Sequence, residues 1–185
     1  EVVRSRFEVD LNRPRSRAVY QGADDAWGLP VWAHELPDVE DRESRSVYDR
    51  FYREAMELHG SFEASGAPVV VLDLHSYYHR RDGAGRPAAD ARENPDINVG
   101  TRRIDREHWA PVVDAFLESL VADGIDAREN VKFGGGHLCH AVAERFPRRC
   151  CPLAIEFKKT YMDEWTGQPD PVRICELRAA IERAS

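Results

Sequence analysis

Two short, almost wholly apolar segments constrain the fold of this 185-residue chain more than any other feature. Residues 68–74 read Pro-Val-Val-Val-Leu-Asp-Leu shortly after Gly66, and residues 151–157 form a second run in which Leu-Ala-Ile-Glu-Phe follows Pro152. A strand with one face in water alternates apolar and polar residues, whereas a strand buried on both faces is apolar almost throughout. Both segments are therefore predicted to be central strands of a sheet that is covered on both sides.

Segments with helical periodicity alternate with these strands. The predicted helices cover residues 44–59, 108–123, 140–145 and 171–184. In the second of them the apolar residues recur at helical spacing and are interpreted as a core-facing stripe: Trp109, Val112, Val113, Phe116, Leu117 and Leu120. Strands that alternate with helices indicate an α/β fold, so the sequence predicts a mixed, mostly parallel sheet flanked by helices.

The first residues of the chain predict a further strand and an incomplete domain. Within residues 2–11, every second side chain from Val3 to Val9 would share one strand face. The chain begins at Glu1, inside this predicted strand, without an initiator methionine or the basic and apolar pattern of a signal peptide. We therefore expect residues 1–185 to be a single catalytic domain that lacks an N-terminal segment.

Charge and composition exclude several classes of protein. Lys and Arg number 26 against 33 Asp and Glu, and the net charge of −7 argues against general nucleic-acid binding or a basic membrane-binding surface. The mean hydropathy is −0.57, and no apolar run approaches the roughly 20 residues that cross a bilayer. The four cysteines contain no C-x-x-C pair, which argues against a zinc finger, a redox motif or a disulfide scaffold. Reduced thiols and a cytoplasmic location are expected.

A histidine lies near the carboxyl end of the first apolar strand. The strand continues as Asp73-Leu-His-Ser-Tyr, which places His75 at the edge of the sheet where α/β proteins bind their ligands. A rigidly held imidazole suits a metal ligand, although a hydrogen-bonded structural histidine has the same sequence signature. The segment that follows, residues 80–106, is rich in Gly, Pro and charge, and loops of this length are usually functional.

Two more strand ends carry polar side chains. Asn12 and Arg13 follow the strand predicted at the start of the chain, and their amide and guanidinium groups suit a carboxylate ligand, although a solvated turn would look the same. Glu156 interrupts the second apolar strand, where an unpaired carboxylate is costly. A carboxylate placed there can accept a proton from a metal-bound water and pass it to a leaving amine, so Glu156 is the predicted catalytic residue.

A glycine-rich segment precedes the third predicted helix. Phe133-Gly-Gly-Gly-His137 allows backbone N–H groups to approach an anion, and a helix that starts near His137 would add its positive end. His137 is therefore a candidate substrate-binding residue, while a simple tight turn explains the glycines equally well. The sequence contains neither a P-loop nor a dinucleotide fingerprint.

Six motifs are spread over the chain. They begin at Phe7, Ala26, Tyr48, Asp73, Asn94 and Glu156 and read FEVDLNRPR, AWGLPVW, YDRFY, DLHSYYHRR, NPDINVGT and EFKKTYMDEWTG. Together they resemble the N-formylglutamate amidohydrolase family, which belongs with the zinc carboxypeptidases, the succinylglutamate desuccinylases and the aspartoacylases. The resemblance implies a zinc carboxypeptidase-like (phosphorylase/hydrolase-like) α/β fold. It also implies hydrolysis of N-formyl-L-glutamate to formate and glutamate, a step of histidine degradation.

The resemblance implies a role for each strand-end residue. His75 corresponds to the third ligand of a catalytic Zn²⁺ ion, and Glu156 to the general base and acid. Asn12 and Arg13 correspond to the clamp on a substrate carboxylate. The implied partner is a small acyl amino acid, with neither nucleic acid nor membrane involved.

Three further cationic residues follow the strand ends. Arg80 and Arg81, just past His75, are the next candidates for binding a dicarboxylic substrate, although each is equally compatible with a solvated loop charge. Lys158 lies two residues beyond Glu156, so its side chain leaves the same strand face. It could pair with Glu156 or meet the substrate.

The chain departs from the family pattern at the metal site. The family's other two zinc ligands, a His and a Glu close together, precede the Asn-Arg motif, but no histidine precedes Asn12 here and no H-x-x-E occurs. We expect these ligands upstream of residue 1; the pairs His79 with Asp82 and His137 with His140 are less well placed. Alternative functions are a related zinc deacylase or carboxypeptidase on another acyl amino acid or peptide, and a non-catalytic carboxylate-binding module with an incomplete metal site.

Overall fold

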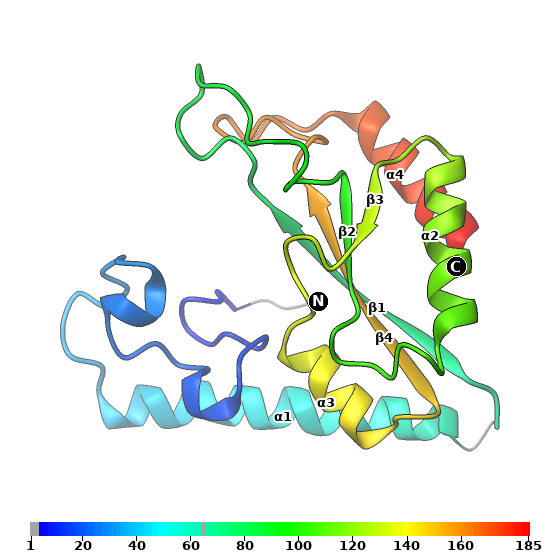
Figure 1. The fold of residues 1–185 in the computed structure, drawn as a ribbon. Coiled ribbons are helices and arrows are strands. Elements are labelled where there is room, and N and C mark those ends of the chain that lie inside the picture. Colours follow the sequence, from blue (N-terminus) through cyan, green and yellow to red (C-terminus); the bar gives the residue numbers. More distant parts are fainter. Residues whose placement is uncertain (1–3, 64–65) are drawn as a thin grey trace.

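The computed structural model describes residues 4–63 and 66–185, which contain a four-stranded mixed sheet (Figure 1). Its strands are β1 (Val69–Tyr77), β2 (Ile97–Gly100), β3 (Ala127–Glu129) and β4 (Cys150–Lys158), in the order β1-β4-β2-β3. β1 is parallel to β4 and β2 is parallel to β3, while β2 and β4 are antiparallel. Both apolar segments of the sequence are strands, as predicted, and they pair with each other.

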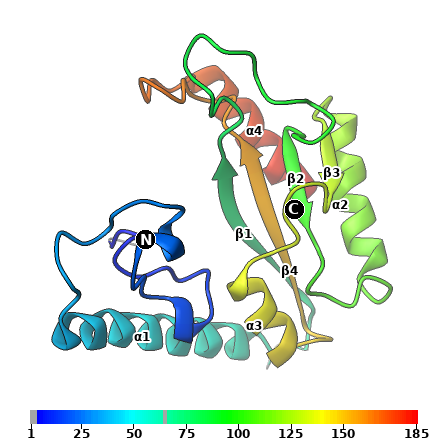
Figure 2. The same cartoon turned by 60° about the vertical axis from the view of Figure 1, so that its left-hand side comes forward.

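Helices flank the sheet on both sides (Figures 1 and 2). α2 and α4 pack together against one face, α3 lies against the other, and α1 runs alongside α3. None of the helices within the described ranges combines the length and the apolar character needed to cross a membrane. The helices are α1 (Asp38–Glu63), α2 (Ala110–Ala122), α3 (His137–Arg145) and α4 (Pro171–Ala184), with short 3₁₀ helices η1 (Arg15–Arg17) and η2 (Ala23–Ala26) before α1.

Alternation along β4 divides the sheet into two chemically different faces. Cys151, Leu153 and Ile155 point into the main core beneath α2 and α4, whereas Cys150 packs on the α3 side. Because successive side chains of a strand point to opposite faces, Glu156 lies on the α3 face. The polar residue of this apolar strand therefore lies outside the main core.

The predicted core stripe of α2 is confirmed. Trp109, which precedes the helix, and Val113, Phe116 and Leu120 are buried, while Val112 and Leu117 are partly buried. They pack against buried residues of β2, β4 and α4. The spacing of apolar residues thus identified the face of α2 correctly.

The strand predicted over residues 2–11 is wrong where the structure describes it. Residues 4–11 form turns closed by backbone hydrogen bonds to the carbonyl of Ser5, and residues 1–3 lie outside the described part of the chain. Val9 is buried, but it packs against α1 and not within a sheet. Of the alternating side chains from Ser5 to Val9, Val9 alone is shown packed against α1, while Phe7 is 37% exposed and lies edge-on to Tyr20.

Two short strands were not predicted. β2 lies inside the segment 80–106 and reads Ile-Asn-Val-Gly, in which Asn98 and Gly100 obscure the apolar pattern. All four residues of β2 are buried. Asn98 is tolerated because its amide donates to the carbonyl of Phe133 at 2.9 Å and accepts from the backbone N–H of Lys132 at 2.8 Å.

The prediction of a central strand over residues 68–74 is wrong: β1 is an edge strand within the described chain, since β4 is its only neighbour there. On the face toward α4, Val70 is 44% exposed and Leu74 is 59% exposed. Leu74 also lines an apolar groove of about 490 Å³ beside α4.

Truncation of Phe116 tests the main core. Phe116 is 3% exposed, and Phe116→Ala is expected to lower the free energy of unfolding by about 3–5 kcal/mol because it leaves a cavity. Val121 on the same helix is 56% exposed, so Val121→Ala should change it by less than about 0.5 kcal/mol. Urea unfolding monitored by circular dichroism gives both values, and equal effects would contradict the assigned face.

Candidate active site

Strand pairing places the predicted metal ligand beside the predicted acid–base residue. In the parallel register of β1 and β4, His75 stands opposite Glu156, and Asn98 of β2 stands opposite Glu156 on its other side. Directly opposed residues of neighbouring strands project from the same face of a sheet. His75 and Glu156, 81 positions apart in the sequence, therefore share the α3 face.

His75 is held by a carboxylate from its own strand. Its Nε2 lies 2.9 Å from Oδ1 of Asp73, and the other Asp73 oxygen accepts a contact of 3.5 Å from Sγ of Cys139. The hydrogen bond to Asp73 raises the pKa of His75 above its usual value, against the opposing effect of burial. Asp73 was assigned no role from the sequence, yet its position two residues before His75 puts both side chains on one face.

Glu156 carries an unengaged carboxylate. No residue in the described ranges forms a hydrogen bond or ion pair with it, and the side chain is half-buried. Burial, together with the charge of Asp73, raises the pKa of Glu156 above its usual value, while the charge of His75 acts in the opposite direction. A free carboxyl group with a raised pKa is suited to accepting and returning a proton near neutral pH.

Asn12 reaches this pair from the turn region near the start of the chain. Its Nδ2 lies 3.4 Å from Nε2 of His75, and its Oδ1 lies 3.4 Å from the backbone nitrogen of Leu138 at the start of α3. The backbone N–H of Asn12 donates to Asp10, and its carbonyl accepts from His137 at 3.3 Å. Asn12 thus links β1 to the first turn of α3.

Two tyrosines of α1 fix the backbone on either side of Asn12. The hydroxyl of Tyr52 donates to the carbonyl of Leu11 at 2.6 Å, and that of Tyr48 donates to the carbonyl of Arg13 at 3.0 Å. The two rings are stacked with centroids 4.5 Å apart. Hydrogen bonds therefore satisfy three successive carbonyls of this turn, which holds the Asn12 amide in one orientation.

The glycine-rich segment before α3 serves close packing. A Cβ atom on Gly136 would lie 2.0 Å from Oδ1 of Asn12, and one on Gly100 would lie 2.6 Å from the nitrogen of Gly135. Gly135 also has φ +105°, which favours glycine. Because Asn12 already engages the start of α3, these contacts favour the tight-turn interpretation of the glycines.

His137 lies at the border of this arrangement. Its ring is 5.5 Å from that of Tyr52 and 6.1 Å from that of His140, and it is half-buried. Burial lowers the pKa of His137, which keeps the imidazole neutral at pH 7. Its role in substrate binding stays a prediction.

Arg13 is held by stacking more than by hydrogen bonds. Its Cζ lies 4.4 Å from the ring centroid of Tyr20 and 5.3 Å from that of Trp27, and its Nε lies 3.4 Å from Oδ2 of Asp10. Within the described chain, Nη1 of Arg13 is the buried side-chain nitrogen that lacks a hydrogen-bond partner. Such a donor is available to an anion.

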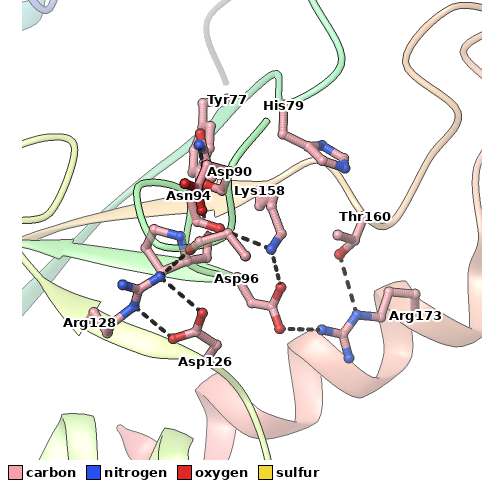
Figure 3. Close-up of polar contacts among 12 residues, drawn as sticks. Tyr77, His79, Asp90, Asn94, Asp96, Asp126, Arg128, Lys158, Thr160 and Arg173 are labelled. Atoms are coloured by element: carbon pink, nitrogen blue, oxygen red, sulfur yellow. Dashed lines mark hydrogen bonds and ion pairs between the residues drawn. The ribbon is translucent and has the colours of Figure 1, made fainter. Parts of the chain in front are cut away.

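Of the three cationic residues that follow the strand ends, Lys158 is paired with a carboxylate, whereas Arg80 and Arg81 have exposed side chains. Lys158 pairs with Asp96 at 2.7 Å and donates to the carbonyl of Asn94, so it does not pair with Glu156 (Figure 3). The backbone N–H of Arg80 donates to Glu164, and the side chains of Arg80 and Arg81 are exposed. Substrate binding by these two arginines stays a prediction.

Figure 3 shows how the network around Lys158 secures the long loop. Asp96 also faces Arg173 of α4 at 3.6 Å, and Arg128 of β3 donates to the carbonyls of Ala91 and Arg92. These contacts fix residues 91–96 between β4, β3 and α4.

A metal site is not complete within residues 4–63 and 66–185. No group of three His, Cys, Asp or Glu side chains there is arranged to hold an ion. His75 and its neighbours Asp73 and Glu156 supply one imidazole and two carboxylates on one face, but a catalytic zinc ion needs three protein ligands.

Comparison with known proteins identifies the family. A family model for N-formylglutamate amidohydrolases matches residues 2–162. The chain belongs to the N-formylglutamate amidohydrolase family. The resemblance read from the six motifs is thereby confirmed, and membership assigns the chain to a family of amidohydrolases.

Solved structures agree with this family in fold. The crystal structure of N-formylglutamate amidohydrolase from Ralstonia eutropha JMP134 matches with a TM-score of 0.67 and 20% identity, over 97% of this chain and 72% of its own. A protein from Agrobacterium tumefaciens matches with a TM-score of 0.61 and 18% identity, over 97% and 67% of the two chains. The comparison with curated proteins finds no significant match.

Substitution of Gly136 tests the contact with Asn12. Gly136 has φ −89°, which alanine adopts without strain, so the effect of Gly136→Ala is steric and is expected to cost about 1–3 kcal/mol of stability. Hydrogen exchange of the His137 and Leu138 amides should accelerate, because both donate to Asn12. Gly22→Ala, whose Cβ meets nothing within 4 Å, is the control. Unchanged exchange in Gly136→Ala would contradict the assigned position of Asn12.

Asp10 is expected to make the free energy of unfolding depend on pH in the acid range. Burial alone would raise its pKa, but hydrogen bonds from Tyr20 and Arg6 outweigh burial and hold the pKa below its usual value. A lowered carboxyl pKa stabilises the fold above the unfolded value of about 3.9, and this contribution disappears as the pH falls through the folded-state pKa. Asp10→Asn should therefore cost about 2 kcal/mol at pH 7 and progressively less below about pH 4.

Urea titrations of Asp10→Asn and the parent chain between pH 2 and pH 7 would measure this difference. Asp49, exposed and paired with Arg15, provides the control, since Asp49→Asn should change stability by less than about 0.5 kcal/mol. A constant difference between Asp10→Asn and the parent at all pH values would refute the argument.

Proposed function

We propose that this member of the amidohydrolase family cleaves the amide bond of a small N-acyl amino acid, with N-formyl-L-glutamate as the expected substrate. The observation that carries the proposal is the opposition of His75 and Glu156 on one sheet face, with Asn12 within 3.4 Å of the imidazole. Family membership supports the reaction type. The products are formate and glutamate.

Glu156 carries out the proton transfers in this proposal. As a water oxygen attacks the formyl carbon, the Glu156 carboxylate accepts one proton from that water. It returns this proton to the amide nitrogen as the C–N bond breaks, which makes the leaving amine neutral. The raised pKa of Glu156 favours the first step, because it makes the carboxylate a stronger base that holds the proton until the C–N bond breaks.

Asn12 and Arg13 orient the substrate. The unpaired Nη1 of Arg13 and the stacked guanidinium offer donors to a carboxylate, while the Asn12 amide lies next to His75. A substrate held in this way presents its acyl group to Glu156, and such positioning accounts for a large share of enzymatic rate enhancement.

Zinc remains part of the proposal through the family resemblance, with His75 as the ligand that the described residues supply. Bound zinc would polarise the acyl oxygen and acidify water. The donor set described above does not by itself fit a zinc ion, since three protein ligands are needed.

Replacement of Glu156 tests the assigned base. Glu156→Gln is expected to lower kcat for N-formyl-L-glutamate by about 10²–10⁴-fold because the proton acceptor is lost. Its stability at pH 7 should be retained or increased, since burial disfavours the ionised carboxylate in the folded state. Glu118→Gln on the exposed side of α2 makes the same change in charge and should keep full activity. Retained turnover in folded Glu156→Gln would rule out this role.

Metal analysis separates the enzyme from a non-catalytic carboxylate-binding module, which the incomplete ligand set favours as the second candidate. After incubation with Zn²⁺ and desalting, one zinc ion retained per chain and lost in His75→Asn would support the enzyme. Substoichiometric zinc in the parent chain, combined with carboxylate binding, would favour the module. Formyl, acetyl, succinyl and peptide substrates, assayed in parallel, identify the acyl group.

A further inference from the structure

Two arginines share one carboxylate near the His75–Glu156 pair. Nη2 of Arg6 lies 2.7 Å from Oδ2 of Asp10, and Nε of Arg13 lies 3.4 Å from the same oxygen. In the described part of the chain, no second carboxylate forms an ion pair with either guanidinium. The cluster therefore holds one positive charge in excess, in a chain whose net charge is −7.

Aromatic stacking holds both guanidiniums without using their N–H donors. The Cζ atoms of Arg6 and Arg13 lie 5.2 and 5.3 Å from the ring centroid of the same indole, that of Trp27. Among the described residues Nη1 of Arg13 has no hydrogen-bond partner, and the Arg6 side chain is 56% exposed. Both arginines thus keep donors that suit bidentate binding of carboxylates.

The cluster borders the candidate active site. Arg13 follows Asn12, whose amide lies 3.4 Å from His75. The guanidinium of Arg6 is close enough to His75 and Glu156 for its positive charge to act on both, and it is linked to Arg13 through the shared Asp10 carboxylate. Nothing in the sequence singles out Arg6, because its partner Asp10 and its neighbour Trp27 are identified only in the folded chain.

We propose that Arg6 extends the carboxylate clamp assigned to Arg13: it binds the side-chain carboxylate of a dicarboxylic acyl amino acid whose α-carboxylate lies on Arg13. This inference rests on the proposed function. The α-carboxylate is attached to the carbon that bears the acylated nitrogen, so it belongs with Arg13, next to Asn12. The side-chain carboxylate lies farther from the reacting bond and meets the more exposed Arg6.

Paired substrates test the assignment. N-formyl-L-glutamine keeps the α-carboxylate of N-formyl-L-glutamate but replaces its side-chain carboxylate with an amide. Arg6→Gln is expected to raise KM for N-formyl-L-glutamate about tenfold or more, which is the size of a lost charge-assisted hydrogen bond, with little change in KM for N-formyl-L-glutamine. Arg6→Lys should recover part of the loss because it restores the charge.

Arg4 offers a matched control. It forms an ion pair with Glu8 four residues later, as Arg6 does with Asp10, so Arg4→Gln removes the same charge from the same segment without touching the cluster. Its KM values should equal those of the parent. Equal losses on both substrates in Arg6→Gln would overturn the assignment. So would a selective loss on N-formyl-L-glutamate in Arg80→Gln or Arg81→Gln that Arg6→Gln does not show.

Ligand binding keeps this test separate from the proposed reaction. Calorimetry with glutarate and butyrate compares two carboxylates with one, without requiring turnover. Tighter binding of glutarate that Arg6→Gln abolishes would support this role of Arg6 even if the chain hydrolysed no formamide. Glutarate binding no tighter than butyrate would refute it.

Discussion

The parallel register between β1 and β4 is the constraint on which the candidate site depends. It pairs Val69 with Cys150 and continues without a bulge to Tyr77 and Lys158, and so brings His75 opposite Glu156. A shift of one residue would send one of these side chains into the apolar core beneath α2 and α4. The buried residues of β4 leave little freedom for such a shift, since Cys151, Leu153 and Ile155 would have to leave the main core. The same forces that form the core therefore set the spacing of the polar pair.

The turn that carries Asn12 and Arg13 is held in place by contacts with α1 and α3, since it belongs to no helix or strand itself. Its carbonyls accept hydrogen bonds from two tyrosines of α1 and from the first residue of α3, and its next anchor is the Asp10 carboxylate. A segment outside sheets and helices is ordinarily mobile. Here α1 and α3 both hold it, which explains how a turn can present an amide and a guanidinium with fixed geometry. This arrangement also explains why the long α1 contributes to the site without carrying any of its predicted residues.

The sequence was informative where burial alone decides the structure. The two apolar strands, the stripe of α2 and the position of Glu156 follow from periodicity and hydrophobicity, which are local properties. β2 could not be recognised, because Asn98 is satisfied by partners more than 30 residues away. The strand predicted over residues 2–11 is a series of turns where the structure describes it, because backbone hydrogen bonds to Ser5 and the packing of Val9 on α1 are not visible in the alternation of side chains. Likewise, the contact of Asp73 with Cys139 forms only when α3 packs on β1. The contacts of Arg6 with Asp10 and Trp27 form only in the folded chain. Contacts between distant segments, and not composition, decide these positions.

The open side of β1 has a consequence for handling the protein. Within residues 4–63 and 66–185, β1 pairs with a strand on one side alone, so its other edge, flanked by exposed Val70 and Leu74, is a template onto which a strand from another chain can be added. β1 also carries His75, so any such addition would reach the segment on which catalysis is proposed to depend. Self-association at high concentration would then disturb the position of His75 before it unfolded the main core.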